Sequence, residues 1–268
     1  MRARLGGLAA FAVLMSLSVT TASASAAAGS ASAAGGSTSS VISTLTSVPV
    51  SATDAVGDGG SQVSAPRSIP GTPLTARGKP EMLYIGAEYC PFCGFERWAM
   101  IVALSRFGTF SGLTESRSST SDVYPGTPTW TFYGSTFSSR YITFEPVELY
   151  SDTPSAGGFK PLQALTRPQQ ALFKKWDGPP YVPAEDAESF PFIDFGNKYL
   201  AIGSGGSPGV LHGLSWAQIA ADLSRPSTKV ARAVDGTANY LTAALCKLTH
   251  DAPARACTRV VRSLQGKI

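Results

Sequence analysis

The sequence predicts an α/β fold in which a central sheet carries helices on both faces. Strand-like and helix-like segments alternate along the chain from residue 81 to residue 264. The short apolar run Glu81–Gly86 is typical of a buried strand, and a cysteine-containing helix start follows it at once. Two later strands flank Gly196–Asn197, a dipeptide typical of a tight hairpin turn. This order favours a layered α/β arrangement over a β-sandwich or a helical bundle.

The other elements each have a local signal. Pro91 suits the first turn of a helix over 94–107, where Phe95, Trp98 and Ile101 mark one apolar face. Further strands are expected at 129–133, 141–150, 190–195 and 198–202, with a loop over 108–126. Further helices are expected at 166–176, capped by Thr166, at 215–223, opened by a Ser215–Gln218 capping box, at 228–248, and between Pro253 and residue 264.

Composition excludes several classes of protein. Charged residues make up only 15% of the chain and hydrophobic residues 43%, which argues against a highly charged disordered protein. No apolar run reaches the roughly 18 residues that span a bilayer, which argues against a channel. The net charge of +4 is no sign of nucleic-acid binding, so we expect no nucleic-acid partner.

The first 26 residues have the pattern of a secretory signal peptide. A basic start at 1–4 precedes the apolar stretch Leu5–Val19, and Ala24–Ser25–Ala26 fits a cleavage site. The alternative is a retained N-terminal membrane anchor, which would associate the protein with a membrane. Either interpretation places the rest of the chain outside the cytoplasm, in a secreted or cell-envelope protein.

Residues 27–78 have the composition of a linker. Ala, Ser, Gly, Thr and Pro dominate this stretch, and no aromatic residue occurs between Phe11 and Tyr84. Such a segment cannot bury enough apolar area to offset the entropy of ordering it. We therefore expect a disordered linker over 27–78 and one folded domain over 79–268.

The Cys-Pro-Phe-Cys motif at 90–93 is the strongest chemical signal in the chain, because it lies between a buried strand and a helix. Unpaired N–H groups and the helix dipole stabilise a thiolate at such a position. We therefore expect Cys90 to be the attacking thiol. Cys93, one turn further on, would be the resolving thiol.

Two further cysteines, Cys246 and Cys257, are separated by ten residues. We expect a structural disulfide that joins the end of one helix to the start of the next and stabilises the fold by about 2–3 kcal/mol. A second redox pair is the alternative. For the motif at 90–93, the alternatives are a zinc site shared with Cys246 and Cys257, and an inert disulfide. Attachment of c-type haem is excluded because Gly94 stands where a histidine is required.

The segment Ala87–Cys93 after an apolar strand resembles the active-site segment of the thioredoxin superfamily. Phe190–Asn197 resembles the cis-proline strand and β-turn of that superfamily. The resemblance implies a thioredoxin-like fold with a central mixed sheet, extended here by an inserted β-rich segment and by C-terminal helices over 228–264. It also implies that Pro191 is cis, lies against Cys90 and shapes a peptide-binding groove.

The region 77–268 further resembles an exported thioredoxin-like family catalogued as domain of unknown function 929, whose name carries no activity. The segments that carry this resemblance are 88–98, 132–135, 196–199, 215–220 and 246–249. The chain departs from ordinary thioredoxins at Tyr84, which stands where they carry a buried acid. Glu88 and Glu96 are candidates to replace that acid, although we expect both to be solvated or salt-bridged.

Together these patterns predict an exported thiol–disulfide oxidoreductase that acts on protein or peptide thiols and disulfides, with Cys90, Cys93 and Pro191 as catalytic residues. The reaction needs no metal or organic cofactor, but an unidentified redox partner must reset the cysteine pair. The main alternative is a noncatalytic thioredoxin-like binding or scaffolding module with two structural disulfides. Copper delivery through the reduced pair is a further alternative, without support from a Met- or His-rich loop.

Overall fold

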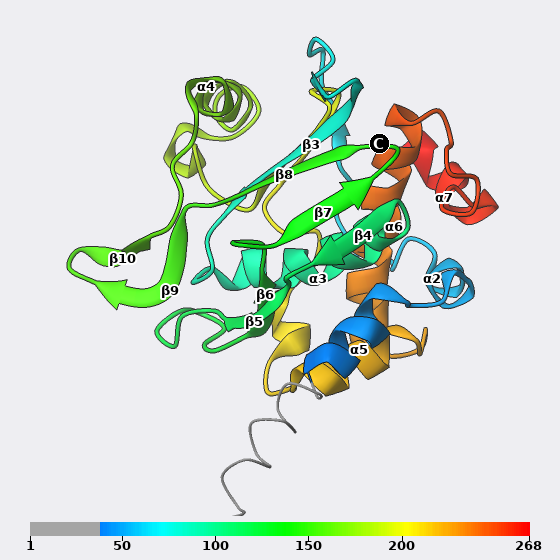
Figure 1. Cartoon of the computed structure of the whole chain (residues 1–268), viewed down its shortest axis with the longest axis horizontal. Coiled ribbons are helices and arrows are strands. Elements are labelled where there is room, and N and C mark those ends of the chain that lie inside the picture. Colours follow the sequence, from blue (N-terminus) through cyan, green and yellow to red (C-terminus); the bar gives the residue numbers. More distant parts are fainter. Residues whose placement is uncertain (1–37) are drawn as a thin grey trace, which may run out of the picture. The chain divides into compact units, whose positions relative to one another are not determined.

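A mixed sheet forms the centre of the computed structural model, which describes residues 38–268 (Figure 1). Its central strand, β3 (Lys79–Gly86), runs parallel to β8 (Thr143–Glu148) on one side and antiparallel to β11 (Phe192–Phe195) on the other. Three further strands complete it: β12 (Tyr199–Ile202) beside β11, β1 (Arg67–Ser68) beside β12, and β2 (Thr75–Ala76) against the start of β3. The predicted α/β class with a mixed sheet is confirmed.

The strand β3 is buried on both faces, which explains its continuous apolar sequence. Because successive side chains of a strand point to opposite faces, Met82 and Tyr84 enter one core while Leu83 and Ile85 enter the other. All four side chains are fully buried. The sheet therefore needs helices on both sides.

Three helices cover the face of Met82 and Tyr84: α3 (Pro91–Ser105), α5 (Trp216–Leu223) and α6 (Lys229–Leu248). The helix α4 (Arg167–Trp176) packs Phe173 and Trp176 against the opposite face. The expected caps are present at Thr166 and Ser215, and Thr228 also caps its helix; each side chain accepts a backbone hydrogen bond. Helices on both faces of the sheet are therefore confirmed.

Antiparallel strand pairs form a β-rich insertion between α3 and α4 (Figure 1). They are β4 (Gly108–Ser111) with β7 (Thr136–Ser139), β5 (Thr114–Arg117) with β6 (Pro128–Thr131), and β9 (Tyr150–Ser155) with β10 (Gly158–Pro161). The loop expected over 108–126 is wrong in part, because β4 and β5 fall within it. Both strands are mostly exposed and have no apolar run, so the sequence lacks the usual strand signal.

The expectation of a disordered linker over 27–78 is wrong for residues 38–78. A helix over 38–46, α2 (Val50–Val56), β1 and β2 lie in this stretch, and Val41 and Leu45 are buried in the main core. Residues 27–37 and the predicted leader over 1–26 lie outside the described residues.

Contacts with α6 explain the order of residues 53–59 in this segment, and pairing of β1 with β12 and of β2 with β3 holds its later part. A Cβ on Gly236 of α6 would lie 2.6 Å from the Cα of Gly59, so the two backbones touch. Asn239 donates hydrogen bonds of 2.7 Å and 2.8 Å to the carbonyls of Thr53 and Gly57. The segment has little apolar area of its own, and the surface of α6 supplies the partner that composition alone cannot reveal.

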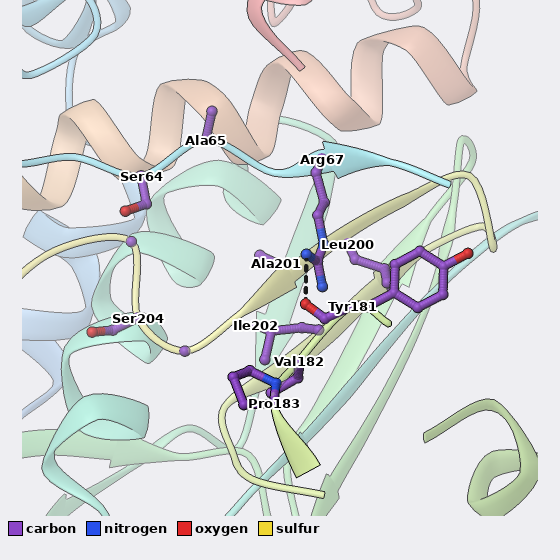
Figure 2. Close-up of a pocket in the computed structure, with 12 residues that line it drawn as sticks. Ser64, Ala65, Arg67, Tyr181, Val182, Pro183, Leu200, Ala201, Ile202 and Ser204 are labelled. Carbon is purple, nitrogen blue, oxygen red and sulfur yellow. Dashed lines mark hydrogen bonds between the residues drawn. The ribbon is translucent and has the colours of Figure 1, made fainter. Parts of the chain in front are cut away.

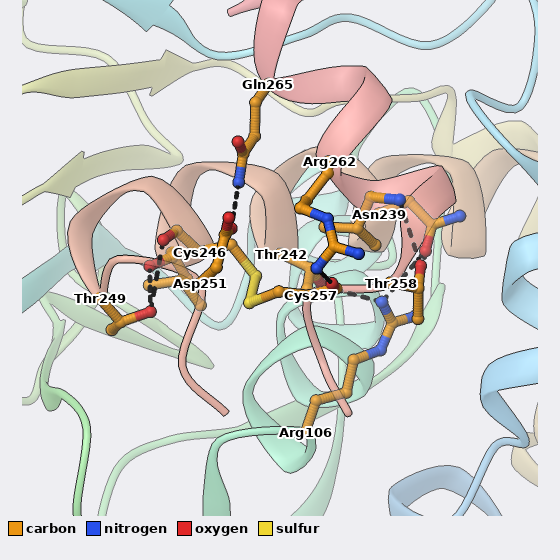
Figure 3. Close-up of a disulfide and its surroundings, with 12 residues drawn as sticks. Arg106, Asn239, Thr242, Cys246, Thr249, Asp251, Cys257, Thr258, Arg262 and Gln265 are labelled. Carbon is orange, nitrogen blue, oxygen red and sulfur yellow. Dashed lines mark hydrogen bonds between the residues drawn. A yellow bond between two sulfur atoms is a disulfide. The ribbon is translucent and has the colours of Figure 1, made fainter. Parts of the chain in front are cut away.

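The C-terminal region is joined to α6 by a disulfide between Cys246 and Cys257, as predicted (Figure 3). It links the end of α6 to the loop before α7 (Arg259–Leu264), and the two Cα atoms are 5.8 Å apart. Short 3-10 helices complete the described elements: η1 (Ala184–Asp186), η2 (Pro208–Leu211) and η3 (Gln265–Lys267). From residue 38 onward, no helix has the length and apolar character needed to cross a bilayer.

Candidate redox site

Cys90 caps the N-terminus of α3, directly after the loop that leaves β3. Its sulfur accepts a hydrogen bond from the backbone N–H of Cys93, with an Sγ–N distance of 3.3 Å. Pro91 occupies the first turn, where its missing N–H costs nothing because that group would have no helical partner. The local sequence therefore places one sulfur on the positive end of the helix dipole.

The strand β11 brings Pro191 to the same place. The Phe190–Pro191 peptide bond is cis, as predicted. The Cys90 thiol donates to the carbonyl of Phe190, with an Sγ–O distance of 3.8 Å. Antiparallel pairing of Phe192 with Ile85 explains why Phe190 lies next to Cys90, because this pairing aligns the start of β11 with the end of β3, just before the motif. Cys90, Cys93 and the Phe190–Pro191 bond thus converge from two segments a hundred residues apart.

The two thiols are free and differ in their surroundings. A hydrogen bond with the Cys93 thiol lowers the pKa of Cys90, and the backbone N–H of Cys93 and the charge of Arg97 act in the same direction against burial. Burial raises the pKa of Cys93 well above its usual range. Cys90 is 6% exposed and Cys93 is fully buried, so the geometry favours Cys90 as nucleophile and keeps Cys93 protonated.

A buried ion pair lies beneath the motif. Arg97 of α3 and Glu148 of β8 form two hydrogen bonds, of 2.8 Å and 2.7 Å, and both side chains have no exposed area. Sequence reasoning missed this pair because its members are 51 residues apart. The available signal was the position of Arg97, four residues after Cys93 and hence on the same face of the helix.

Tyr84 occupies the strand position expected for a buried acid, and its hydroxyl has no hydrogen-bond partner among residues 38–268. A Cβ on Gly86 would lie 2.1 Å from that hydroxyl oxygen, so glycine is required there. Burial raises the pKa of the Tyr84 phenol well above its usual range. Tyr84 therefore remains neutral.

The expectation that Glu88 and Glu96 are solvated or salt-bridged is wrong. Glu88 is 8% exposed and Glu96 is fully buried, and neither forms an ion pair within the described part of the chain. Burial raises the pKa of Glu88, and it raises that of Glu96 to about 7. In the sequence, Glu88 and Glu96 have the polarity of solvated residues. In the fold, the β-rich insertion and the loop after β12 cover them.

Aromatic side chains lie on both sides of Cys90 in the chain, at Tyr89 and Phe92. Tyr89 stacks on Phe159 of β10, with ring centroids 4.0 Å apart, and meets Phe190 edge-on at 5.9 Å. On the other side, Phe92 of the motif is 40% exposed and contacts Tyr124 edge-on at 6.1 Å. These five rings, which we call the aromatic rim, offer an apolar contact surface beside the nucleophile.

Among the cavities of the described residues, one lies beside β12 and another near Phe190. The first, of about 290 Å³, is lined by residues of β12 and of the 64–67 and 181–183 segments, with Arg67 donating to the Tyr181 carbonyl at 2.9 Å (Figure 2). Its lining includes neither cysteine of the motif. The second, of about 510 Å³, is lined by Tyr150 and Phe190 among others and so adjoins the aromatic rim.

Cys246 and Cys257 are not available as metal ligands. The Asp251 carboxylate lies within 4.8 Å of both sulfurs, yet sulfurs joined in a disulfide lack the thiolate that a zinc ligand needs. Asp251 instead accepts a hydrogen bond of 2.7 Å from Gln265 (Figure 3). The four-cysteine zinc alternative is therefore wrong.

Residues 66–156 match the model of the family described as Domain of unknown function (DUF929). The match includes β3, the Cys-Pro-Phe-Cys motif, Arg97 and Glu148, and it ends before Pro191. It supports the expected family resemblance over this part of the expected region 77–268. No curated protein and no solved structure matches the chain.

Proposed function

We propose that this protein is an exported thiol–disulfide oxidoreductase that acts on protein or peptide thiols and disulfides. The observation that carries the proposal is the contact of 3.8 Å between the Cys90 sulfur and the carbonyl that precedes cis-Pro191. A nucleophilic sulfur at a helix N-terminus, beside backbone that can pair with a peptide, is suited to thiol–disulfide exchange.

The topology supports a thioredoxin-like domain. In the order β8–β3–β11–β12, only β8 and β3 are parallel, and the motif lies where β3 leads into α3. α3 and α6 cover one face of this sheet, and α4 covers the other. This arrangement agrees with the mixed sheet and helices that the resemblance implies.

The reaction runs in two exchanges. The Cys90 thiolate attacks one sulfur of a substrate disulfide, which breaks the substrate S–S bond, forms a mixed disulfide and releases the first substrate thiol after protonation. Cys93 then loses its proton and attacks the Cys90 sulfur, which releases the second substrate thiol and leaves a Cys90–Cys93 disulfide. Two electrons and two protons pass to the substrate. A dithiol redox partner restores the pair, and the reverse steps oxidise a substrate dithiol.

Exchange with a peptide disulfide tests the proposal. The reduced full-length protein should cleave a fluorophore-quencher peptide joined by one disulfide, and Cys90→Ser should abolish the cleavage. Cys93→Ser should instead accumulate the mixed disulfide, visible as a mass increase on the peptide that contains Cys90. The double variant Cys246→Ser/Cys257→Ser removes two cysteines away from the site and should retain the activity.

The opposite result has a definite meaning. If the wild-type protein does not cleave the peptide, or if Cys90→Ser cleaves it equally well, the oxidoreductase proposal is wrong. A binding or scaffolding module would then account better for the fold.

A further inference from the structure

The guanidinium of Arg97 lies near the cysteine pair and is only partly hydrogen-bonded although it is buried. It is fully buried, one helical turn after Cys93, and two of its nitrogens bind the two carboxylate oxygens of Glu148. Its third nitrogen, Nη1, has no hydrogen-bond partner among residues 38–268. A buried donor without a partner costs free energy, and stability alone does not explain why it is retained.

The neighbours of Arg97 show which charge acts on the thiols. The ring of Tyr84 lies 5.9 Å from the guanidinium carbon and is neutral, so the strand contributes no carboxylate here. Glu148, on β8, offsets part of the positive charge of Arg97. Glu88, in the loop before α3, interacts electrostatically with this ion pair. Arginine keeps its charge at every pH at which the protein is folded, whereas a buried acid does not.

We propose that Arg97 is a positioning residue of this site: its buried guanidinium, fixed by Glu148, stabilises the thiolate form of the cysteine pair. The inference rests on the proposed function for its role in catalysis, but the electrostatic effect exists whether or not a substrate is exchanged. The charge of Arg97 acts to lower the pKa of both Cys90 and Cys93, in agreement with this role. Glu148 then has two opposed effects, because it holds the cation in place and weakens its field.

The test measures the pKa of Cys90 without any substrate. Reduced full-length protein is alkylated with iodoacetamide from pH 4 to pH 10, and mass spectrometry follows the rate at Cys90. Arg97→Gln should raise the pKa of Cys90 by about 1, because removal of a neighbouring opposite charge shifts a pKa by that order. Alkylation at pH 7 should then slow by up to about tenfold.

Two variants separate charge from packing. Arg97→Lys keeps the positive charge but loses the two-nitrogen contact with Glu148. The pKa of Cys90 in this variant should stay close to the wild-type value. Glu148→Gln removes the opposing charge and should lower the pKa of Cys90 below that of the wild type. A merely structural ion pair predicts instead that all three variants shift the pKa in the same direction.

A matched control comes from the other end of the same helix. Arg106, the C-cap of α3, is also buried and binds Asn239 and Thr242, so Arg106→Gln loses a buried guanidinium far from the motif. It should leave the pKa of Cys90 unchanged. The inference is overturned if Arg97→Gln leaves that pKa unchanged, or if Arg97→Lys shifts it as much as Arg97→Gln. If Arg97→Gln does not fold, Glu148→Gln decides: a lower pKa of Cys90 supports the inference, and an unchanged or higher pKa overturns it.

This outcome is independent of the proposed function. A protein in which Arg97 controls the Cys90 pKa but which exchanges no peptide disulfide would refute the oxidoreductase proposal alone. If the wild-type protein exchanges the peptide disulfide but Arg97→Gln leaves the pKa of Cys90 unchanged, only the role of Arg97 is refuted.

Discussion

The Oε2 atom of Glu96 accepts a hydrogen bond of 2.8 Å from the backbone N–H of Gly205. This bond joins the helix that carries both thiols to the loop after β12. The second carboxylate oxygen, Oε1, has no partner within residues 38–268, and the side chain is fully buried. Glu96 therefore favours its protonated form in the folded protein.

Glu96 should make the protein less stable as the pH rises. Burial raises the pKa of Glu96 to about 7 from 4.5, so the folded state binds more protons than the unfolded state between these values. Glu96 has no effect on the free energy of unfolding below pH 4.5. Between pH 4.5 and pH 7 it lowers that free energy progressively, by about 3 kcal/mol at most. Glu96→Gln should thus raise the free energy of unfolding in urea at pH 8 and have little effect at pH 4.5.

Glu185→Gln serves as the control for this measurement, because Glu185 is exposed. Equal changes for both variants, or a Glu96→Gln effect that does not depend on pH, would contradict the assignment.

The disulfide between Cys246 and Cys257 should act on stability alone. It closes a short loop with a sequence separation of 11, for which the entropy of loop closure predicts about 3 kcal/mol. Cys246→Ser/Cys257→Ser should lower the unfolding free energy by this amount in urea titrations. Its rate of peptide-disulfide exchange under folding conditions should equal that of the wild type; a lost rate in a folded variant would instead indicate an electron relay.

The aromatic rim should favour peptides over small disulfides. Phe92 is 40% exposed beside the nucleophile, and an aromatic contact with a substrate contributes about 1 kcal/mol. Phe92→Ala should therefore slow exchange with the quenched peptide about fivefold while leaving exchange with bis(2-hydroxyethyl) disulfide unchanged. Tyr199→Ala, at the opposite end of the sheet, should alter neither rate, and an equal loss with both substrates would exclude a role in recognition.

The contact between Gly59 and Gly236 should hold the N-terminal segment on α6. A methyl group at Gly236 would lie 2.6 Å from the Cα of Gly59, so Gly236→Ala should displace the segment and increase its cleavage by proteases. Gly266→Ala adds the same group where nothing lies within 4 Å and should have no such effect. Mass spectrometry of early cleavage sites distinguishes the two results, and unchanged cleavage in Gly236→Ala would show that the contact is not needed.

Local signals made some parts of this structure predictable. The caps at Thr166, Ser215 and Thr228 depend on residues within one turn, so the starts of three helices could be read from the sequence. The hairpin around Asn197 and the helix start at Cys90 are equally local.

Other parts depend on partners that are distant in sequence. The order of residues 38–78 comes from contacts with α6, β12 and β3, and the Arg97–Glu148 pair joins two elements that no local pattern connects. The burial of Glu96 depends on the loop at Gly205, 109 residues away. Polarity predicted a solvated or salt-bridged Glu96, and tertiary contacts reversed that expectation.

The packing of residues 38–78 against the rest of the domain also limits how far the domain can lie from a retained leader. A linker over 27–78 would have let the domain extend far from any surface that held its leader. With the helix over 38–46 fixed to the core, the apolar stretch of a retained leader, which ends at Val19, is separated from the fold by residues 20–37 only. Such a stretch spans at most about 65 Å when fully extended. A retained leader would thus tether the first described helix within that distance of the membrane surface.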